Sequence, residues 1–110
     1  MTSTPAALLQ TKYLEDAETT QYTAPTNVKG VRVDDFTVCN RTAGPITLTV
    51  RVVPSGGTPG VEHELLAAKS IAAGEVYEVG PIFLGPGDFI RTDPSAASSL
   101  VARISGRIFT

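Results

Sequence analysis

The sequence predicts an all-β protein: a single β-sandwich, of jelly-roll or immunoglobulin-like type, with an extended N-terminal arm. Three observations lead to this prediction. Apolar and polar residues alternate along two stretches of the chain, which is the pattern of half-buried strands. Turn-forming residues separate the apolar stretches about every ten residues. No stretch has the period of a long amphipathic helix.

The two clearest strands lie in the middle and at the end of the sequence. In the first, one face is formed by Ile46, Leu48, Val50 and Val52, and the other by Thr47, Thr49 and Arg51. In the second, Leu100, Ala102, Ile104 and Ile108 share a face, while Arg103, Ser105 and Arg107 point away. Gly106 falls on the apolar face of this strand. That position predicts a bulge or a close approach by a neighbouring backbone.

A third long strand, from Val31 to Asn40, changes phase along its length. Val31 and Val33 are in one phase and Phe36 and Val38 in the other. One extra residue would reconcile the two phases, so we expect a bulge near Asp34-Asp35. Shorter strands are predicted at 21–24, 64–67, 76–79, 82–84 and 89–92.

The first 20 residues differ in character from the rest of the chain. Thr4 and Pro5, followed by the short apolar run Ala6–Leu9, have the features of an N-cap and one helical turn. The polar stretch Glu15–Gln21 has no period. We expect residues 1–20 to form a partner-contacting arm and residues 21–110 the sandwich, with the arm held by its own domain or by a neighbouring chain. Deleting residues 1–20 is then expected to leave the sandwich folded and to abolish assembly.

Length and composition are those of one small globular domain. The chain has 110 residues, of which 42% are apolar and 18% charged, and its formal net charge is −2. This charge argues against nucleic acid or an anionic membrane as a partner, because both attract clustered Lys and Arg. The single cysteine, Cys39, excludes an internal disulfide and suits assembly in a reducing compartment.

No targeting or membrane segment is predicted. The N-terminus has no basic start, and its apolar run is much shorter than that of a signal peptide. Nothing approaches the roughly 20 apolar residues that span a bilayer. We therefore expect the protein to be made in the cytoplasm and to stay soluble until it meets its partner.

The residue types that carry chemistry are few and scattered. His63 is the only histidine, and in a strand Glu62 and Glu64 would point to the opposite face, so the triplet would chelate poorly. Cys39 ends an apolar strand, where a small buried thiol is expected. Four aspartates are of the residue type that binds Ca²⁺, but they lack the spacing of a calcium loop, which favours solvated carboxylates: Asp34, Asp35, Asp88 and Asp93. We predict no enzyme activity, no cofactor, and no catalytic, cofactor-binding or metal-binding residues.

Six short phrases, taken in order between about residues 20 and 108, resemble a known group of proteins. They begin at Tyr22, Val38, Val52, Ile71, Leu84 and Ile104, and read YTAP, VCNRT, VVPSGGT, IAAGE, LGPGDFIR and ISG. In this order and spacing they are similar to the small β-sandwich structural proteins encoded among the head and tail genes of tailed bacteriophages. The first 20 residues lie outside the resemblance.

The resemblance implies a non-enzymatic virion protein that decorates or cements the capsid through protein–protein contacts. It implies a homotrimer whose partners are its own copies and the major capsid protein or other virion proteins, and it carries no catalytic residues. Two alternatives stay open. One is a tail-associated or fibre-associated module that binds carbohydrate or protein through loops 54–60 and 85–88. The other is a head–tail connector or tail component.

Overall fold

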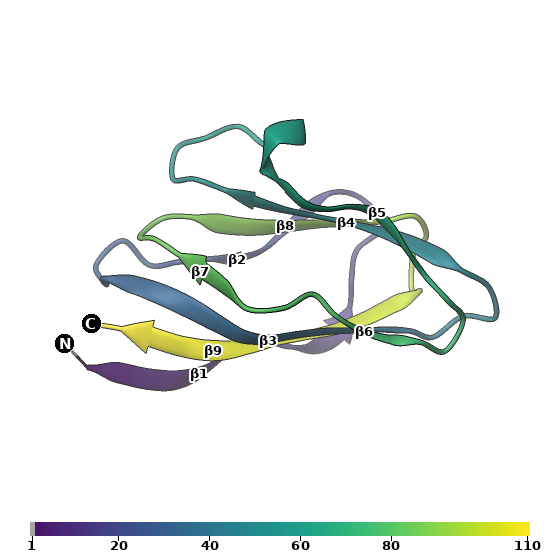
Figure 1. The fold of residues 1–110 in the computed structure, drawn as a ribbon, viewed down its shortest axis with the longest axis horizontal. Helices are drawn as coiled ribbons and strands as arrows, with labels where there is room; N and C mark the ends of the chain where they lie inside the picture. Colours follow the sequence, from purple (N-terminus) through teal and green to yellow (C-terminus); the bar gives the residue numbers. More distant parts are fainter. Residues whose placement is uncertain (1) are drawn as a thin grey trace.

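The computed structural model describes residues 2–110, and these residues form two antiparallel sheets packed face to face (Figure 1). Sheet A contains, in spatial order, β1 (Ser3–Tyr13), β9 (Leu100–Phe109) and β3 (Gly30–Asn40), and along the far edge of β3 lie β6 (Val76–Glu78) and β7 (Ile82–Leu84), one after the other. Sheet B contains β2 (Thr19–Thr23), β8 (Phe89–Pro94), β4 (Ile46–Val53) and β5 (Glu64–Ile71). A 3-10 turn, η1 (Val61–His63), precedes β5. The predicted β-sandwich is confirmed.

The strands pair in a nested manner. β1 pairs with β9, β2 with β8, β3 with β6 and β7, and β4 with β5, and successive pairs belong to alternate sheets. The two ends of the described chain therefore lie side by side (Figure 1), where the Thr110 amide donates a hydrogen bond of 2.8 Å to the Thr2 carbonyl. No helix within residues 2–110 is long and apolar enough to cross a membrane.

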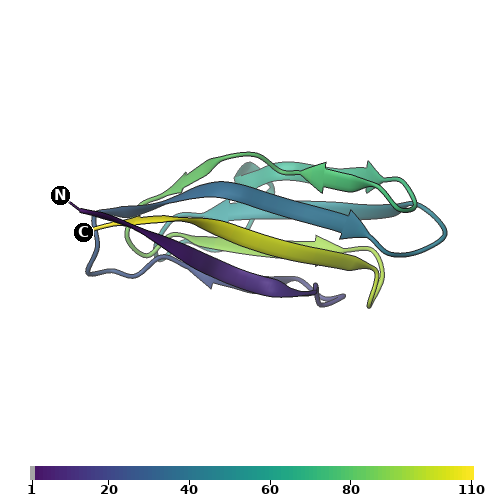
Figure 2. The same ribbon diagram turned by 90° about the horizontal axis from the view of Figure 1, so that it is seen from below.

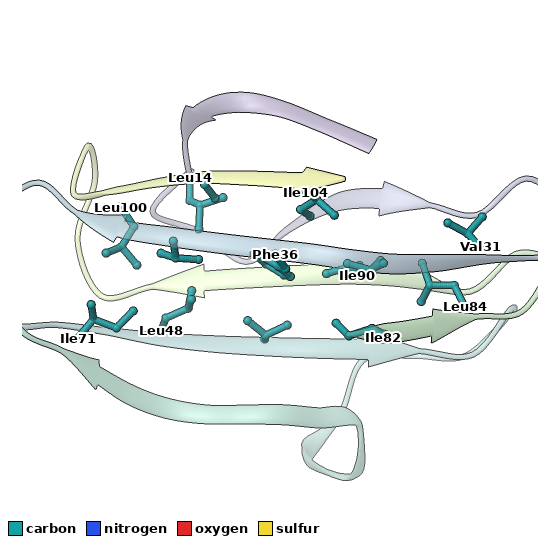
Figure 3. Packing of buried hydrophobic residues seen from close by; sticks show 14 of the residues in the cluster. Leu14, Val31, Phe36, Leu48, Ile71, Ile82, Leu84, Ile90, Leu100 and Ile104 are labelled. Carbon is teal, nitrogen blue, oxygen red and sulfur yellow. The ribbon is translucent and has the colours of Figure 1, made fainter. Parts of the chain in front are cut away.

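The core lies between the two sheets and is built from their inward faces. Phe36, Leu48 and Ile104 are completely buried in it, and Figure 3 shows these side chains packed between the strands of both sheets. The alternation predicted for β4 and β9 is confirmed. Inward residues of both strands are buried, and Val52 and Ile108 at their ends are half-buried against the same cluster.

The predicted bulge in β3 is present. The pairing of β3 with β9 shifts register between Val33 and Asp35, so Asp34 is the extra residue. Gly106 pairs with Val33 at this point, and a Cβ built on it would lie 1.9 Å from the Arg32 carbonyl oxygen. Of the two explanations open for this glycine, close approach of a neighbouring backbone is therefore the one that the structure bears out.

The N-terminal prediction needs correction. Residues 4–9 are part of β1 and not a helical turn, because this segment completes the edge of sheet A by pairing with β9. Leu14, just after β1, is 1% exposed and donates its amide to the Leu100 carbonyl at 2.8 Å. Residues 3–14 thus belong to the sandwich, and deleting residues 1–20 would remove a strand and a core side chain. Met1 lies outside the described residues.

The shorter predicted strands are all present, although only β7 has the predicted bounds, and the largest difference is in β5. β5 continues to Ile71, beyond the predicted end at Ala67, because a bulge interrupts its alternation. Ala68 lies in this bulge with a φ of +47°, and its amide donates to Thr49 Oγ1 at 3.0 Å. The Thr49 side chain therefore satisfies an amide that the distorted ladder would otherwise leave free.

A buried asparagine fixes the turn between β3 and β4. Asn40 is fully buried, and its Nδ2 donates to the carbonyls of Gly44 and Ile71, both at 2.9 Å. Its Oδ1 accepts from the amide and the hydroxyl of Thr42 at 2.9 and 2.8 Å. With donors and acceptor all paired, this polar side chain is tolerated in the core and joins the two sheets at one end.

Candidate functional site

The outer face of sheet A is the part of the surface with the most features of a contact site. Residues that pair directly across strands point to the same side of the sheet. The register therefore places outward side chains in rows across the sheet, from β1 to β6 or β7: Pro5, Arg107, Arg32 and Phe83 in one row, Arg103, Thr37 and Glu78 in another, and Tyr13, Val101, Cys39 and Val76 in a third. Figure 2 shows this sheet from below, with β1 (purple), β9 (yellow) and β3 (blue) side by side.

Most of the exposed large apolar side chains lie on this face, on the strands at its edges. Among residues 2–110, five large apolar side chains are exposed, and three of them lie here: Tyr13 (50%), Val76 (63%) and Phe83 (63%). The other two lie beside sheet B, Val61 in η1 and Leu65 in β5. Tyr13, Val76 and Phe83 lie apart, on the edge strands β1, β6 and β7, so only a contact that spans the whole face would cover all three.

Two shallow hollows adjoin each other on the same face. The larger, of about 370 Å³, lies over β1, β9 and the β3 bulge, and Arg103, Ser105 and Arg107 line it. The smaller, of about 270 Å³, is lined by Thr37, Cys39 and again Arg103 among others. Arg103 thus forms the wall between the two hollows.

The charges of this face are only partly paired within the chain. Arg32 Nε contacts Asp34 Oδ1 at 2.7 Å, and its guanidinium lies 6.0 Å from the centre of the Phe109 ring. In contrast, none of the ion pairs found among residues 2–110 includes Arg103 or Arg107. Within residues 2–110, the one hydrogen bond of the Arg107 side chain is donated to the Ser3 hydroxyl, at 3.3 Å.

Two carboxyl groups lie together on the other half of the face. Asp35 accepts a hydrogen bond of 2.5 Å from the Thr37 hydroxyl, and Glu78 pairs with Thr37 across the strands. A hydrogen bond with Asp35, together with the negative charge of Asp35, raises the pKa of Glu78, because both favour its protonated form. Neither carboxylate belongs to an ion pair within the described residues.

The outer face of sheet B differs, because the two arginines at its centre are paired with carboxylates. Arg51 and Arg91 are directly opposite across β4 and β8, and Glu18 binds both guanidinium groups, contacting Arg91 Nε at 2.8 Å. Glu64 adds a second contact to Arg51 at 2.8 Å, and its hydrogen bond is the main cause that raises the pKa of Arg51. These charges need no external partner, so sheet A is the better candidate for a contact surface.

His63 lies in a short turn beside Gly60 and Glu62. It ends the η1 turn and does not begin a strand, so its Nδ1 accepts the Gly60 amide at 3.2 Å and Glu62 lies near it, at 3.6 Å. The expectation that Glu62 points to the opposite face was wrong, because a 3-10 turn does not alternate sides as a strand does. Within residues 2–110, no three His, Cys, Asp or Glu side chains lie together as metal ligands would.

Cys39 is not a fully buried thiol as expected. It is partly exposed and lines the smaller hollow on the outer face of sheet A. The bulge at Asp34 is the reason, since it turns Phe36 and Val38 inward and leaves the alternate residues of β3 facing outward. The buried position at the end of the strand is occupied by Asn40.

The two loops considered for ligand binding lie together in space. Asp88 Oδ1 accepts the Ser55 amide at 3.0 Å, and Asp88 Oδ2 accepts the Gly85 amide at 2.9 Å. Gly87 has a φ of +82°, and a Cβ there would lie 2.4 Å from Ser55 Oγ. Asp88 therefore acts as a link between the loops, and not as the solvated carboxylate that was expected.

The chain was compared with protein families, with curated proteins and with solved structures. None of these comparisons finds a match. The resemblance to bacteriophage structural proteins therefore rests on the six sequence phrases alone.

The sequence predicted the outward residues of β9 on this face, but not those of the edge strands β1, β6 and β7. It placed Arg103, Ser105 and Arg107 on the outside of the last strand, as the structure does. It missed Phe83 and Val76, because three-residue strands are too short to show a period. It also missed Tyr13, which the sequence placed in an arm. The alternation in Ile82-Phe83-Leu84 was the one signal that marked Phe83 as outward.

Proposed function

We propose that this chain is a non-enzymatic structural protein of a bacteriophage virion, which decorates or cements the capsid by protein–protein contact. The observation that carries this proposal is the outer face of sheet A, where exposed apolar side chains and arginines without ion-pair partners occur together. Aromatic residues and Arg are the types enriched in protein interfaces. The virion as location and the major capsid protein as a partner follow from the resemblance.

We further propose that the sandwich is a jelly roll and not an immunoglobulin-like fold. The nested pairing of the strands supports this choice, because it is the pattern of one long hairpin rolled up into two sheets. A rigid sandwich of this kind presents a broad, flat sheet to a partner. The homotrimer implied by the resemblance stays a prediction.

A binding module of a tail or fibre is the second candidate. The observation in its favour is the contact between loops 54–60 and 85–88, which Asp88 holds at one end of the sandwich. Against it, these loops display no aromatic side chain except Phe89 at their margin, whereas carbohydrate sites commonly use aromatic platforms. A head–tail connector or tail component would use the same surfaces. The part of the virion to which the protein binds distinguishes this role from capsid decoration.

The test is co-sedimentation of the purified protein with capsids that were assembled without it. We expect stoichiometric binding, and loss of binding for the double variant Phe83→Ser/Arg107→Glu on the outer face of sheet A. The matched control is Val61→Ser/Arg41→Glu, which likewise replaces an exposed apolar residue by Ser and reverses one charge, at η1 and in the β3–β4 turn. If the protein ignores capsids but binds isolated tails or fibres, the capsid role is wrong and the second candidate stands.

A further inference from the structure

We propose that the outer face of sheet A packs face to face against the same face of a second copy of this chain. This inference rests on the proposed function, since it assumes that the face makes protein–protein contacts, and it names the partner. It follows from the charges, from the register of the strands and from the positions of the exposed apolar residues.

The charges left without ion-pair partners on this face are of both signs. Arg103 and Arg107 lie on β9, whereas Asp35 and Glu78 lie on β3 and β6. A partner of predominantly one sign would satisfy one half of the face and repel the other. A second copy supplies equal numbers of both signs, which is the complementarity that a symmetric pair requires.

The strand order sets the symmetry of the pair. A two-fold axis that runs parallel to the strands, between β9 and β3, places β9 of one copy over β3 of the other, and β1 over β6 and β7. Each residue keeps its row along the sheet. Arg103 then faces Thr37 of the second copy, with the adjoining carboxylates of Asp35 and Glu78 of that copy beside it.

The same axis brings apolar residues together at both ends of the face. Tyr13 and Val76 are in one row, on β1 and β6, so Tyr13 of each copy lies over Val76 of the other. Pro5 and Phe83 share another row and are matched in the same way. Packing one copy on another therefore covers the exposed apolar side chains of both and brings Arg103 to the carboxylates of the other copy. Arg107 lies over Arg32 of the second copy, whose charge is already paired with Asp34.

A charge exchange between copies tests the pairing. The variants Arg103→Glu and Glu78→Arg each place like charges opposite each other, so each should weaken self-association at least about tenfold in sedimentation equilibrium. An equimolar mixture of the two variants should restore it, because each contact then joins opposite charges again. Arg41→Glu, the same change in the exposed β3–β4 turn, is the control and should associate like the unaltered protein.

A short thiol crosslinker tests the register independently of charge. In a Cys39→Ser background, Tyr13→Cys and Val76→Cys are combined in one chain. Sheets packed face to face are about 10 Å apart, which is too far for a disulfide between opposed cysteines but within reach of a short bifunctional maleimide. Within one copy, β1 and β6 are separated by two strands, about 14 Å, which is beyond the span of this reagent. The double variant should give a covalent dimer, and the Tyr13→Cys variant without Val76→Cys should give none. A double variant that is not crosslinked would overturn the proposed register.

Three outcomes would overturn the pairing: an unaltered protein that is monomeric at all concentrations tested, a mixture of charge variants that fails to associate, or a trimer. A trimer would instead support the oligomer that the resemblance implies, because one self-complementary face closes only a pair. Capsid binding is measured separately. Pairing without capsid binding would refute the virion role alone, and capsid binding by a protein that does not pair would refute this inference alone.

Discussion

Gly106 lies where β9 passes the bulge of β3, and the absence of a side chain there lets the two backbones approach closely. A Cβ at this position would meet the Arg32 carbonyl carbon and oxygen at 2.9 and 1.9 Å. These are backbone atoms of a central strand, so they cannot move aside as the end of a flexible side chain can. The glycine is therefore required by packing and not by its φ.

We predict that Gly106→Ala destabilises the protein by about 3 kcal/mol or more, because the methyl group forces β9 and β3 apart. The matched control is Gly44→Ala in the β3–β4 turn, where an added Cβ meets nothing within 4 Å. That change should be neutral or stabilise by up to about 1 kcal/mol. Urea unfolding of both variants checks the pair, and equal stabilities would contradict the packing explanation.

The sequence marked Gly106 as unusual but left two explanations open. A glycine on the apolar face of a strand is compatible with a bulge in its own strand or with a close neighbour. The decision depended on Asp34, which bulges from the partner strand and is 72 positions earlier in the chain. No local pattern contains that pairing.

At the scale of elements, the connection from β1 to β2 is held across sheet B by one carboxylate. Glu18 lies in this connection and binds both Arg51 of β4 and Arg91 of β8. Arg91 also donates to the Glu18 carbonyl, at 3.1 Å. Arg51 and Arg91 lie directly opposite each other, and like charges in this position repel. The carboxylate of Glu18 offsets this repulsion and also holds the β1–β2 connection against sheet B.

We predict that Glu18→Gln destabilises the protein by about 1–2 kcal/mol, a value between those of exposed and buried ion pairs. The loss should shrink at high salt, because salt screens the repulsion between Arg51 and Arg91. The control is Glu62→Gln in η1. The Glu62 side chain is 74% exposed and, among residues 2–110, forms no ion pair with an arginine. Thermal unfolding at low and high salt measures both; a salt-independent loss would show that the charge itself is not the cause.

Elements with a clear period were predicted well, and those without one were not. β4 and β9 alternate over many residues, so their buried faces followed from the sequence alone. β1 reads as a helical turn and a polar arm, and its burial pattern shows why, since most of its residues are exposed. An edge strand paired on one side needs few apolar residues, so its place in the sheet is visible only when β9 is beside it.

For the whole molecule, two carboxyl groups should give opposite contributions to the dependence of stability on pH. Glu15 accepts a hydrogen bond from Gln21 Nε2 at 3.0 Å, and this bond, with help from its own backbone and Lys12, lowers the pKa of Glu15. Its contribution is present above the ordinary value of 4.5 and is lost as the pH falls below it. Asp35 raises the pKa of Glu78, so that contribution is present below 4.5 and is lost as the pH rises.

We therefore predict that Glu78→Gln gains stability relative to the unaltered protein as the pH rises from 4 to 7, and that Glu15→Gln loses relative stability over the same range. The measurement is the free energy of unfolding at several pH values, at a dilution where the protein is a single copy, since a second copy would bring Arg103 near Glu78. If the free energies of unfolding of the two variants changed with pH in the same way, the contacts assigned as causes of the two pKa shifts would be wrong.

The sequence by itself determined the β-sandwich, the faces of its long strands and the bulge of β3, because each follows from a two-residue period or its interruption within one stretch of chain. The tertiary structure decided which strands are neighbours, and with them the place of β1, the outward position of Cys39 and the rows of the outer face of sheet A. Tyr13, Arg103 and Glu78 come from distant segments, and only strand pairing brings them onto one surface. Period is a local property, whereas adjacency in a sheet depends on contacts between residues far apart in the chain.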